Sequence, residues 1–262
     1  MPGKVAPVTL TLRKGNVGFN DAIAESAYTK REESAWPLPS TQYTKYYLGS
    51  DNSLSPTQAK SDKESQISYS ALGVIDSKDH FARFETTQFE QETEITGHVL
   101  ARLNVSMIPD SSETESGEKD IDLFLTLRYI DPHGKEVLYT GTAGDGVPLT
   151  KGWLRCSMRK IHDENPRHRE YMPHREYLST DVQPVKANEV YAVDVEIWPT
   201  NVVVEKGGKI VLEVASGDTQ GCGIFQHASD VDRPASKFKG KNVLHLGGGR
   251  ENYVTLPIIP SK

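Results

Sequence analysis

The sequence contains little cysteine, no long apolar run and fewer basic than acidic residues. Its two cysteines, Cys156 and Cys222, allow one disulfide at most, and so low a count is typical of a reducing compartment. No apolar run approaches the ~20 residues that a membrane-spanning helix needs, and the first residues lack a signal-peptide core. With 30 basic against 36 acidic residues, the chain is a poor candidate for general nucleic-acid binding. We therefore expect a cytoplasmic protein with neither a membrane nor a nucleic-acid partner.

A catalytic serine motif is missing as well. An α/β-hydrolase carries its nucleophile on a sharp Gly-x-Ser-x-Gly turn between a strand and a helix. No serine in this chain has glycine at both positions two residues away. The alternation of strands and helices that would carry such a turn is absent too. The residues therefore assign no catalytic side chain, and they leave open whether the chain is an enzyme.

The dominant pattern is a period of two residues. Apolar side chains alternate with polar ones across 95–107, 121–129 and 190–198. This alternation is typical of antiparallel strands with one buried face, not of the continuous apolar runs of a parallel sheet. Seven further segments have the composition of strands: 8–13, 43–48, 67–72, 80–89, 136–140, 243–246 and 252–258.

Turn residues mark where these strands reverse. A Gly-Gly pair divides 202–212 into two apolar halves, which predicts a β-hairpin. Asp, Pro and Gly within 131–134 predict a second turn. A short helix is expected in 20–34, after Asn20. The segment 49–66 shows no period and is expected to be a loop.

Together these elements predict an all-β protein, folded as a jelly-roll β-sandwich. We expect a single domain over 1–262, since β-sandwiches often reach this length, and we take 1–40 as a lead-in segment. Two stretches are expected to be long loops. The first, 109–119, is small, polar and acidic, and the second, 157–189, is rich in charge and proline.

The second of these loops contains three histidines at intervals of six residues, His162, His168 and His174. With the carboxylates between them they could ligate a metal ion. Their spacing matches neither a helical i, i+4 pair nor a zinc finger, and Arg167 and Arg169 would repel a cation. We therefore predict a solvated loop with ion pairs, no metal site and no cofactor.

Several other motifs have both a functional and a plain structural interpretation. Asp120 and Asp122 could supply oxygen ligands to calcium, but acids at a strand start more often cap turns. The glycines at 247–249 lack the Lys-Ser/Thr of a phosphate loop. The His, Ser and Asp in 227–230 are neighbours in sequence, which is no evidence for a triad assembled in space. For each we favour the structural interpretation, and we expect Cys222 to pack near a turn.

Aromatic side chains offer another kind of site. Trp36, Trp153 and Trp198 could each stack on a sugar or a flat ligand, although large aromatics pack more often at core edges. The candidate ligand-binding residues that we select are Trp153, Arg155, His162, His168 and His174.

Eight short segments carry a further signal through their order and spacing: 33–39, 46–49, 94–99, 120–125, 131–134, 152–157, 206–212 and 253–260. Together they resemble the C-terminal domain of X-Pro dipeptidyl-peptidases and cocaine-esterase-like hydrolases. The resemblance implies a galactose-binding-like jelly roll that follows an α/β-hydrolase domain holding Ser, Asp and His. In that family the domain packs against the hydrolase domain, helps to shape the active-site entrance and can contribute to oligomer contacts.

The catalytic half of that family has no counterpart in this chain, so no triad residue can be assigned. The leading hypothesis is a non-catalytic accessory domain that packs against an α/β-hydrolase chain or domain. One alternative is a stand-alone binder of a small, carbohydrate-like molecule. Another is an isomerase or cyclase with a pocket of its own, since neither reaction needs a covalent nucleophile. A homo-oligomer is compatible with each.

Overall fold

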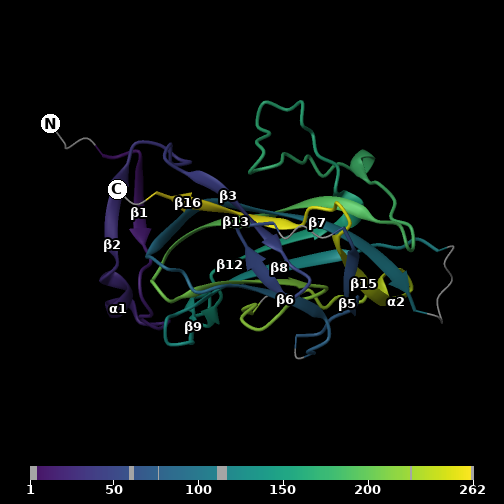
Figure 1. Cartoon of the computed structure of the whole chain (residues 1–262), viewed down its shortest axis with the longest axis horizontal. Coiled ribbons are helices and arrows are strands. Elements are labelled where there is room, and N and C mark those ends of the chain that lie inside the picture. The colour runs from purple at the N-terminus through teal and green to yellow at the C-terminus, as the bar shows by residue number, and fades with distance from the viewer. Residues whose placement is uncertain (1–4, 59–61, 76, 111–116, 225, 261–262) are drawn as a thin grey trace.

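The computed structural model describes residues 5–58, 62–75, 77–110, 117–224 and 226–260. It confirms the all-β class, because strands dominate and helices are few and short (Figure 1). The strands are β1 (Val8–Leu12), β2 (Thr29–Glu33), β3 (Gln42–Leu48), β4 (Ser53–Ser55), β5 (Glu64–Ser70), β6 (Phe81–Thr86), β7 (Thr93–Pro109), β8 (Asp122–Ile130), β9 (Glu136–Val137), β10 (Tyr139–Thr140), β11 (Gly146–Val147), β12 (Thr150–Arg155), β13 (Tyr191–Val204), β14 (Lys209–Ala215), β15 (Gly240–Gly247) and β16 (Tyr253–Ile259). The helices are α1 (Ala22–Ser26) and α2 (Ala235–Phe238), with single 3₁₀ turns η1 (Cys156–Met158) and η2 (Ser179–Asp181).

The main sheet closes on itself as a flattened, barrel-like sandwich. Strands β12, β8, β14 and β6 form one half, and β13, β7, β16 and β3 form the other. Strand β4 joins the halves on one side, where it pairs with both β3 and β6. On the other side β12 meets β13 at the pair Gly152 and Ile197. Strands β15 and β5 extend the second half beside the end of β7.

The core lies between these halves and collects apolar side chains from both, including Leu103, Leu125, Ile197 and Leu212. Alternation along β7, β8 and β13 places the first three of these residues inside, as the period of two predicted, and Leu212 comes from β14. Strand β8 differs from the prediction, because eight of its nine residues are buried and both of its faces are covered. Its polar face, with Thr126 and Arg128, is covered by the segment 216–234, which follows β14.

The predicted hairpin in 202–212 is wrong. The glycine turn is present, but β13 pairs with β7 and β12, whereas β14 pairs with β6 and β8. The chain therefore crosses from one half of the sandwich to the other at this turn. Two consecutive strands joined by a tight turn can pair with each other as a hairpin, or they can pair with other strands in opposite halves of the sandwich. The sequence of the turn does not distinguish these arrangements, because the choice depends on the strands with which each one pairs. The turn at 131–134 is confirmed, because β8 and β9 pair across it and Asp131 caps it.

Two further expectations need correction. The segment 49–66 contains β4 and the start of β5, so it is not entirely a loop. The helix expected in 20–34 is only α1, and β2 occupies 29–33. Asp21 caps α1, where its carboxylate accepts from the amides of Ile23 and Ala24. Strand β2 then pairs with β1, so the lead-in segment forms a small sheet at the left of Figure 1.

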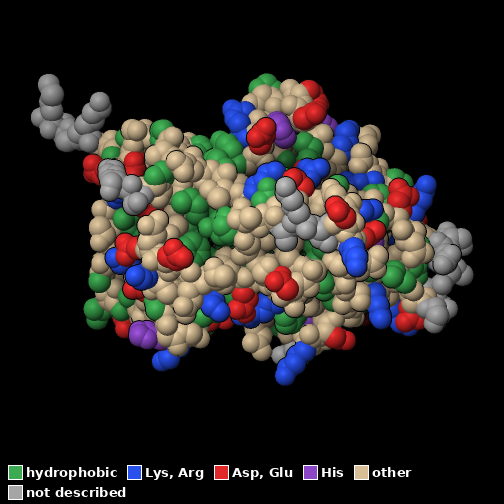
Figure 2. All heavy atoms as spheres, viewed as in Figure 1, with side chains coloured by type: hydrophobic (Ala, Val, Ile, Leu, Met, Phe, Trp, Pro, Cys, Tyr) green, Lys and Arg blue, Asp and Glu red, His purple; other side chains and the backbone are tan. Residues whose placement is uncertain are grey.

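The segment 157–189 extends above the sandwich (Figure 1) and holds only η2 and the end of η1 as regular structure. Of the predicted loop 109–119, positions 111–116 lie outside the described residues. Figure 2 shows Lys and Arg interspersed with Asp and Glu on one face, without a field of a single sign. Neither α1, of five residues, nor α2, of four, could cross a membrane, and the described part of the chain holds no other α-helix.

Candidate functional site

An aromatic cleft of about 800 Å³ lies beside the junction of β12 and β13. Trp153 of β12 and Trp198 of β13 meet there edge to face, with ring centroids 5.3 Å apart. The register of β13 shifts between Ile197 and Thr200, and this irregularity carries Trp198 outward, so that 64% of its surface is exposed. Ile224, which is 62% exposed, contributes a second apolar side chain from the segment after β14. The result is an open, largely apolar cleft.

The polar side of the cleft contains a histidine and an aspartate in direct contact. Nδ1 of His227 lies 3.2 Å from Oδ1 of Asp218, and the His227 amide also donates to that carboxylate. The imidazole packs against the rings of Phe124 and Trp153, at 5.1 and 5.9 Å between centroids. A carboxylate at Nδ1 fixes the orientation of an imidazole and leaves Nε2 as its second polar atom. This pair can therefore hold or exchange a proton at a ligand in the cleft.

Lys151 adds a positive charge to the same wall. Its ammonium group donates to the carbonyl of Gly221 at 2.6 Å, and burial lowers its pKa. Cys222 also lines the cleft, as a half-buried free thiol whose pKa is raised by burial. A raised pKa keeps most of the thiol protonated at neutral pH and so lowers its reactivity. The cleft therefore offers aromatic surface, two cationic side chains, Arg13 and Lys151, and the histidine pair, but no activated cysteine.

Arg155 lies in a smaller groove next to the cleft, which shares Trp153 and His227 with it. Its guanidinium binds Asp122 through two nitrogens, at 2.8 and 3.0 Å, and reaches Asp232 at 3.1 Å. These charge-assisted bonds, Asp122 first, raise the pKa of Arg155. Because its donors are occupied by carboxylates, Arg155 acts in this structure as a link between β12 and the segment 216–234.

The three histidines of the second loop come close to one another. The amide of His162 donates to the carbonyl of His174, and the amide of His174 lies 3.4 Å from Nδ1 of His168. Two of the rings contact carboxylates: His162 lies between Asp181 and Glu164, and His174 contacts Glu176. Within the described part of the chain, none of these histidines lines the cleft of Trp153 or the groove of Arg155. The five predicted ligand residues therefore occupy two separate places.

The metal alternatives can be compared with the geometry. No group of three or more His, Cys, Asp or Glu side chains in the described residues is arranged to hold an ion. Oδ1 of Asp120 accepts from the amides of Ile121 and Ser157, and Asp122 is bound by two arginines. Asp120 therefore caps backbone amides, as the sequence favoured, whereas Asp122 is an ion-pair partner and not a cap.

Sequence reasoning selected Trp153 but missed the side chains that complete its cleft. Trp198 was noted only as a general candidate, because a β-bulge cannot be recognised from alternation alone. His227 was considered with Ser229 and Asp230, whereas its carboxylate partner is Asp218, nine residues earlier. The signal that could have revealed the pair is a turn-rich segment with glycines at 217, 221 and 223, which brings Asp218 and His227 back together.

These features define an all-β, barrel-like sandwich with an open aromatic cleft beside the junction of β12 and β13. The chain belongs to the family described as the X-Pro dipeptidyl-peptidase C-terminal non-catalytic domain, whose model matches residues 4–255. The resemblance found in the sequence is thereby confirmed.

Curated relatives and solved structures are longer than this chain. A protein of Mycobacterium bovis named as a serine esterase is 25% identical over 240 residues, which cover 78% of this chain and 35% of that protein. The cocaine esterase of Rhodococcus sp. is 23% identical over 87% of this chain and 40% of its own length. A CocE/NonD family hydrolase from Staphylococcus aureus superposes with a TM-score of 0.77 at 20% identity, covering 98% of this chain and 42% of that one. The chain thus spans about two fifths of these relatives.

Proposed function

We propose that this chain is an accessory domain that docks onto an α/β-hydrolase domain. The proposal is supported by the length of this chain relative to its relatives. The family is a non-catalytic domain, and longer hydrolases contain a matching unit that makes up about two fifths of their length. The remaining three fifths of such a protein would supply the nucleophile that this sequence lacks. The partner is then a hydrolase domain, on a separate chain or covalently joined.

The aromatic cleft is the docking surface that we favour. Trp198 and Ile224 expose large apolar areas side by side, and Val74, 69% exposed, lines a groove that shares Asp218 and His227 with the cleft. Exposed apolar patches of this kind mark interaction sites in soluble proteins, and tryptophan is common among the residues that dominate binding energy. Docking here would cover Trp198 and place His227 at the interface.

Two finer features belong to the same proposal. A jelly-roll assignment of galactose-binding-like type is supported by the two opposed antiparallel halves with four main strands each. A cytoplasmic location is supported by the two free thiols, which persist in a reducing compartment.

A small-molecule site in the cleft is the second candidate. It is favoured by the contact of the His227–Asp218 pair with Trp153, which joins a proton-exchanging group to a flat apolar surface. Such a cleft suits a small planar ligand, or an isomerase or cyclase reaction by proton transfer. Trp153 stays in this site. Arg155, His162, His168 and His174 would have to exchange their present carboxylate or backbone partners to bind a ligand.

The test is native mass spectrometry of the protein purified from its own cells, as wild type and as W198S. We expect a second chain, or a covalent extension beyond 29.1 kDa, whose sequence contains a Gly-x-Ser-x-Gly elbow. A separate hydrolase chain should be lost in W198S. The matched control is Leu178→Ser, since Leu178 is 52% exposed on the segment 157–189.

The two variants separate the outcomes. A hydrolase chain retained by W198S but lost in the Leu178 variant would move the docking surface to that segment. If the hydrolase domain is covalently joined, it cannot dissociate, and limited proteolysis is the measurement to use instead. W198S should then accelerate cleavage between the two domains. A 29.1 kDa protein with no hydrolase in either form, particularly one carrying a small molecule, would overturn the accessory role in favour of the second candidate.

A further inference from the structure

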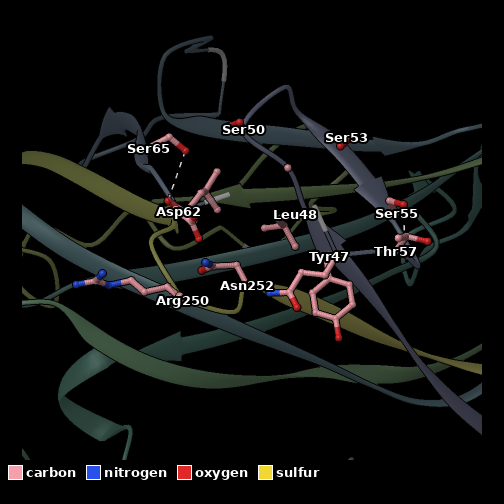
Figure 3. Close-up of a pocket in the computed structure, with 15 residues that line it drawn as sticks. Tyr47, Leu48, Ser50, Ser53, Ser55, Thr57, Asp62, Ser65, Arg250 and Asn252 are labelled. Carbon is pink, nitrogen blue, oxygen red and sulfur yellow. Dashed lines mark hydrogen bonds between the residues drawn. The ribbon is translucent and has the colours of Figure 1, made fainter. Parts of the chain in front are cut away.

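A second, polar pocket lies on a different part of the sandwich. It has a volume of about 400 Å³ and opens between the β3–β4 turn, the start of β5 and the turn that joins β15 to β16 (Figure 3). Leu48 and Leu246 are buried at its base, with 7% and 2% of their surfaces exposed. Nothing in the accessory role explains this pocket.

Hydroxyl and amide groups surround this apolar base. The lining includes five hydroxyl side chains, Ser50, Ser53, Ser55, Thr57 and Ser65. Asn252 adds a buried amide, held by bonds to the Asn104 amide and the His245 carbonyl. Tyr47 adds an aromatic ring, braced edge to face by Tyr253 at 5.9 Å. A pocket with an apolar base and a ring of short polar groups matches a molecule that has C–H faces and many hydroxyls.

The charges of the pocket are balanced. Asp62 supplies one carboxylate and Arg250 one guanidinium, on the opposite side of Figure 3 from Ser55 and Thr57. Arg250 also lies 3.6 Å from Glu64, which contacts His245 at 3.1 Å. This neighbouring carboxylate reduces the attraction of the pocket for an anion. In one pocket, the carboxylate accepts hydrogen bonds from hydroxyls of a ligand and the guanidinium donates hydrogen bonds to others. Because their charges are opposite, the pair does not favour a ligand with a net charge of either sign.

Two glycines shape the turns that border the pocket. A Cβ at Gly49 would lie 2.3 Å from Oγ of Ser53 and 2.4 Å from Oδ1 of Asp51, so a larger residue would displace these groups. Gly249, at φ +79°, has open space where its Cβ would be. Only glycine adopts such a φ without strain, and here the turn leaves the pocket mouth clear beside Arg250.

We propose that this pocket, between Tyr47, Asp62, Arg250 and Asn252, binds a neutral polyhydroxylated ligand of mono- or disaccharide size. Tyr47 presents its ring to the C–H face of the sugar. Asp62 accepts from two hydroxyls and Arg250 donates to a third. This site differs in place and in lining from the five residues that the sequence suggested for a carbohydrate-like ligand.

The test is saturation-transfer NMR of the full chain with a panel of glucose, galactose, mannose, maltose and lactose, and with sulfate as an anionic probe. We expect at least one sugar to bind with a Kd of about 1 mM, typical of a shallow open site. Asp62→Ala and Arg250→Gln should each raise the Kd of that sugar by about tenfold, because each variant removes a hydrogen-bond partner from a buried hydroxyl of the ligand. Asp62 is exposed, so its loss should leave the melting temperature unchanged.

The matched control is Asp230→Ala, an exposed aspartate in the segment 216–234. It should bind the sugar as wild type does. The proposal is overturned if no sugar in the panel binds, or if the Asp62 and Asp230 variants bind equally well. Sulfate binding that requires Arg250, without sugar binding, would overturn it in favour of an anion site. Each outcome leaves the hydrolase docking experiment unaffected, because W198S does not touch this pocket.

Discussion

Arg233 and Asp122 form a buried ion pair between residues 111 positions apart. Nε of Arg233 lies 3.0 Å from Oδ2 of Asp122, and each side chain is only 7% exposed. Arg233 also donates to the carbonyls of Ser216 and His227. The pair therefore ties the end of β14 and the segment 216–234 to β8, and it positions the backbone of His227 at the cleft.

Asp122→Ala should destabilise the protein strongly, because it leaves the guanidiniums of Arg155 and Arg233 without their shared carboxylate. Breaking a buried ion pair by removing one partner costs about 3–5 kcal/mol, and we expect a loss in this range from urea unfolding. The amide signal of His227 should also shift, since its carbonyl is held by Arg233.

The matched control for Asp122 is an exposed ion pair. Glu189 lies 3.9 Å from Lys186, with half or more of each side chain exposed. Glu189→Ala should cost less than about 1 kcal/mol, as is usual for surface pairs. If both variants lose the same free energy of unfolding, the contacts of Asp122 with Arg155 and Arg233 do not stabilise the fold more than a surface ion pair does.

Gly152 lies where the two halves of the sandwich meet, and its substitution is a direct test of that junction. A Cβ there would be 2.2 Å from the carbonyl oxygen of Glu196 and 2.7 Å from Cα of Ile197, which are backbone atoms that cannot rotate away. Gly152→Ala should therefore cost about 3 kcal/mol, at the upper end for overpacking. Gly134→Ala, at φ +80° with nothing near its Cβ, should cost about 1 kcal/mol by backbone strain alone. Thermal unfolding of both variants measures the difference, and a smaller loss at Gly152 would contradict the contact.

Much of the strand content could be predicted from the sequence, because burial of alternate side chains leaves a direct pattern. The way in which the strands pair could not be predicted from the sequence. The glycine turn before β14 fits a hairpin locally, and only contacts far along the chain, such as Leu212 with Leu127, place β14 in the other half. Strand β8 was predicted to have one solvated face, but Thr219 and Arg233 cover it from a segment without any period.

Of the side chains that line the cleft, only Trp153 was selected from the sequence. Trp153 could be chosen because aromatic residues on strands often line clefts. Its partner Trp198 depends on a bulge in β13, and the Asp218–His227 pair depends on the path of a glycine-rich segment. Such positions follow from tertiary structure, which overrides local pattern.

The ion pairs of the second loop predict a specific dependence on pH. The pKa of Asp181 is lowered to about 2, chiefly by its hydrogen bond from Lys160 and then by that from His162, whose own pKa is raised by Asp181. The stabilisation from His162 is thus complete below its usual pKa of 6.5 and is lost as the pH rises through its raised value. The contribution of Asp181 is present above its usual range near 4 and is lost as the pH falls through about 2.

An NMR titration of the His162 ring checks this dependence. Its midpoint should lie above 6.5 in the wild type and move down in Asp181→Asn, which removes the charge that favours the imidazolium. Asp230→Asn, the same change at an exposed site, should leave the midpoint unchanged. A midpoint at or below 6.5 in the wild type would refute the pairing.

The two thiols should differ sharply in reactivity. Cys156 is the first residue of η1 and is fully buried, and burial raises its pKa to about 12. Cys222 is partly exposed at the cleft, with a pKa raised by a less complete burial. Since the thiolate is the reactive form and must be accessible, iodoacetamide at pH 8 should modify Cys222 alone in the native protein and both cysteines in urea. Intact mass spectrometry counts the adducts, and Cys222→Ser should give none under native conditions. Rapid native labelling of Cys156 would show that the end of β12 opens readily. Protection of Cys222 on addition of the proposed hydrolase partner would support docking over the cleft.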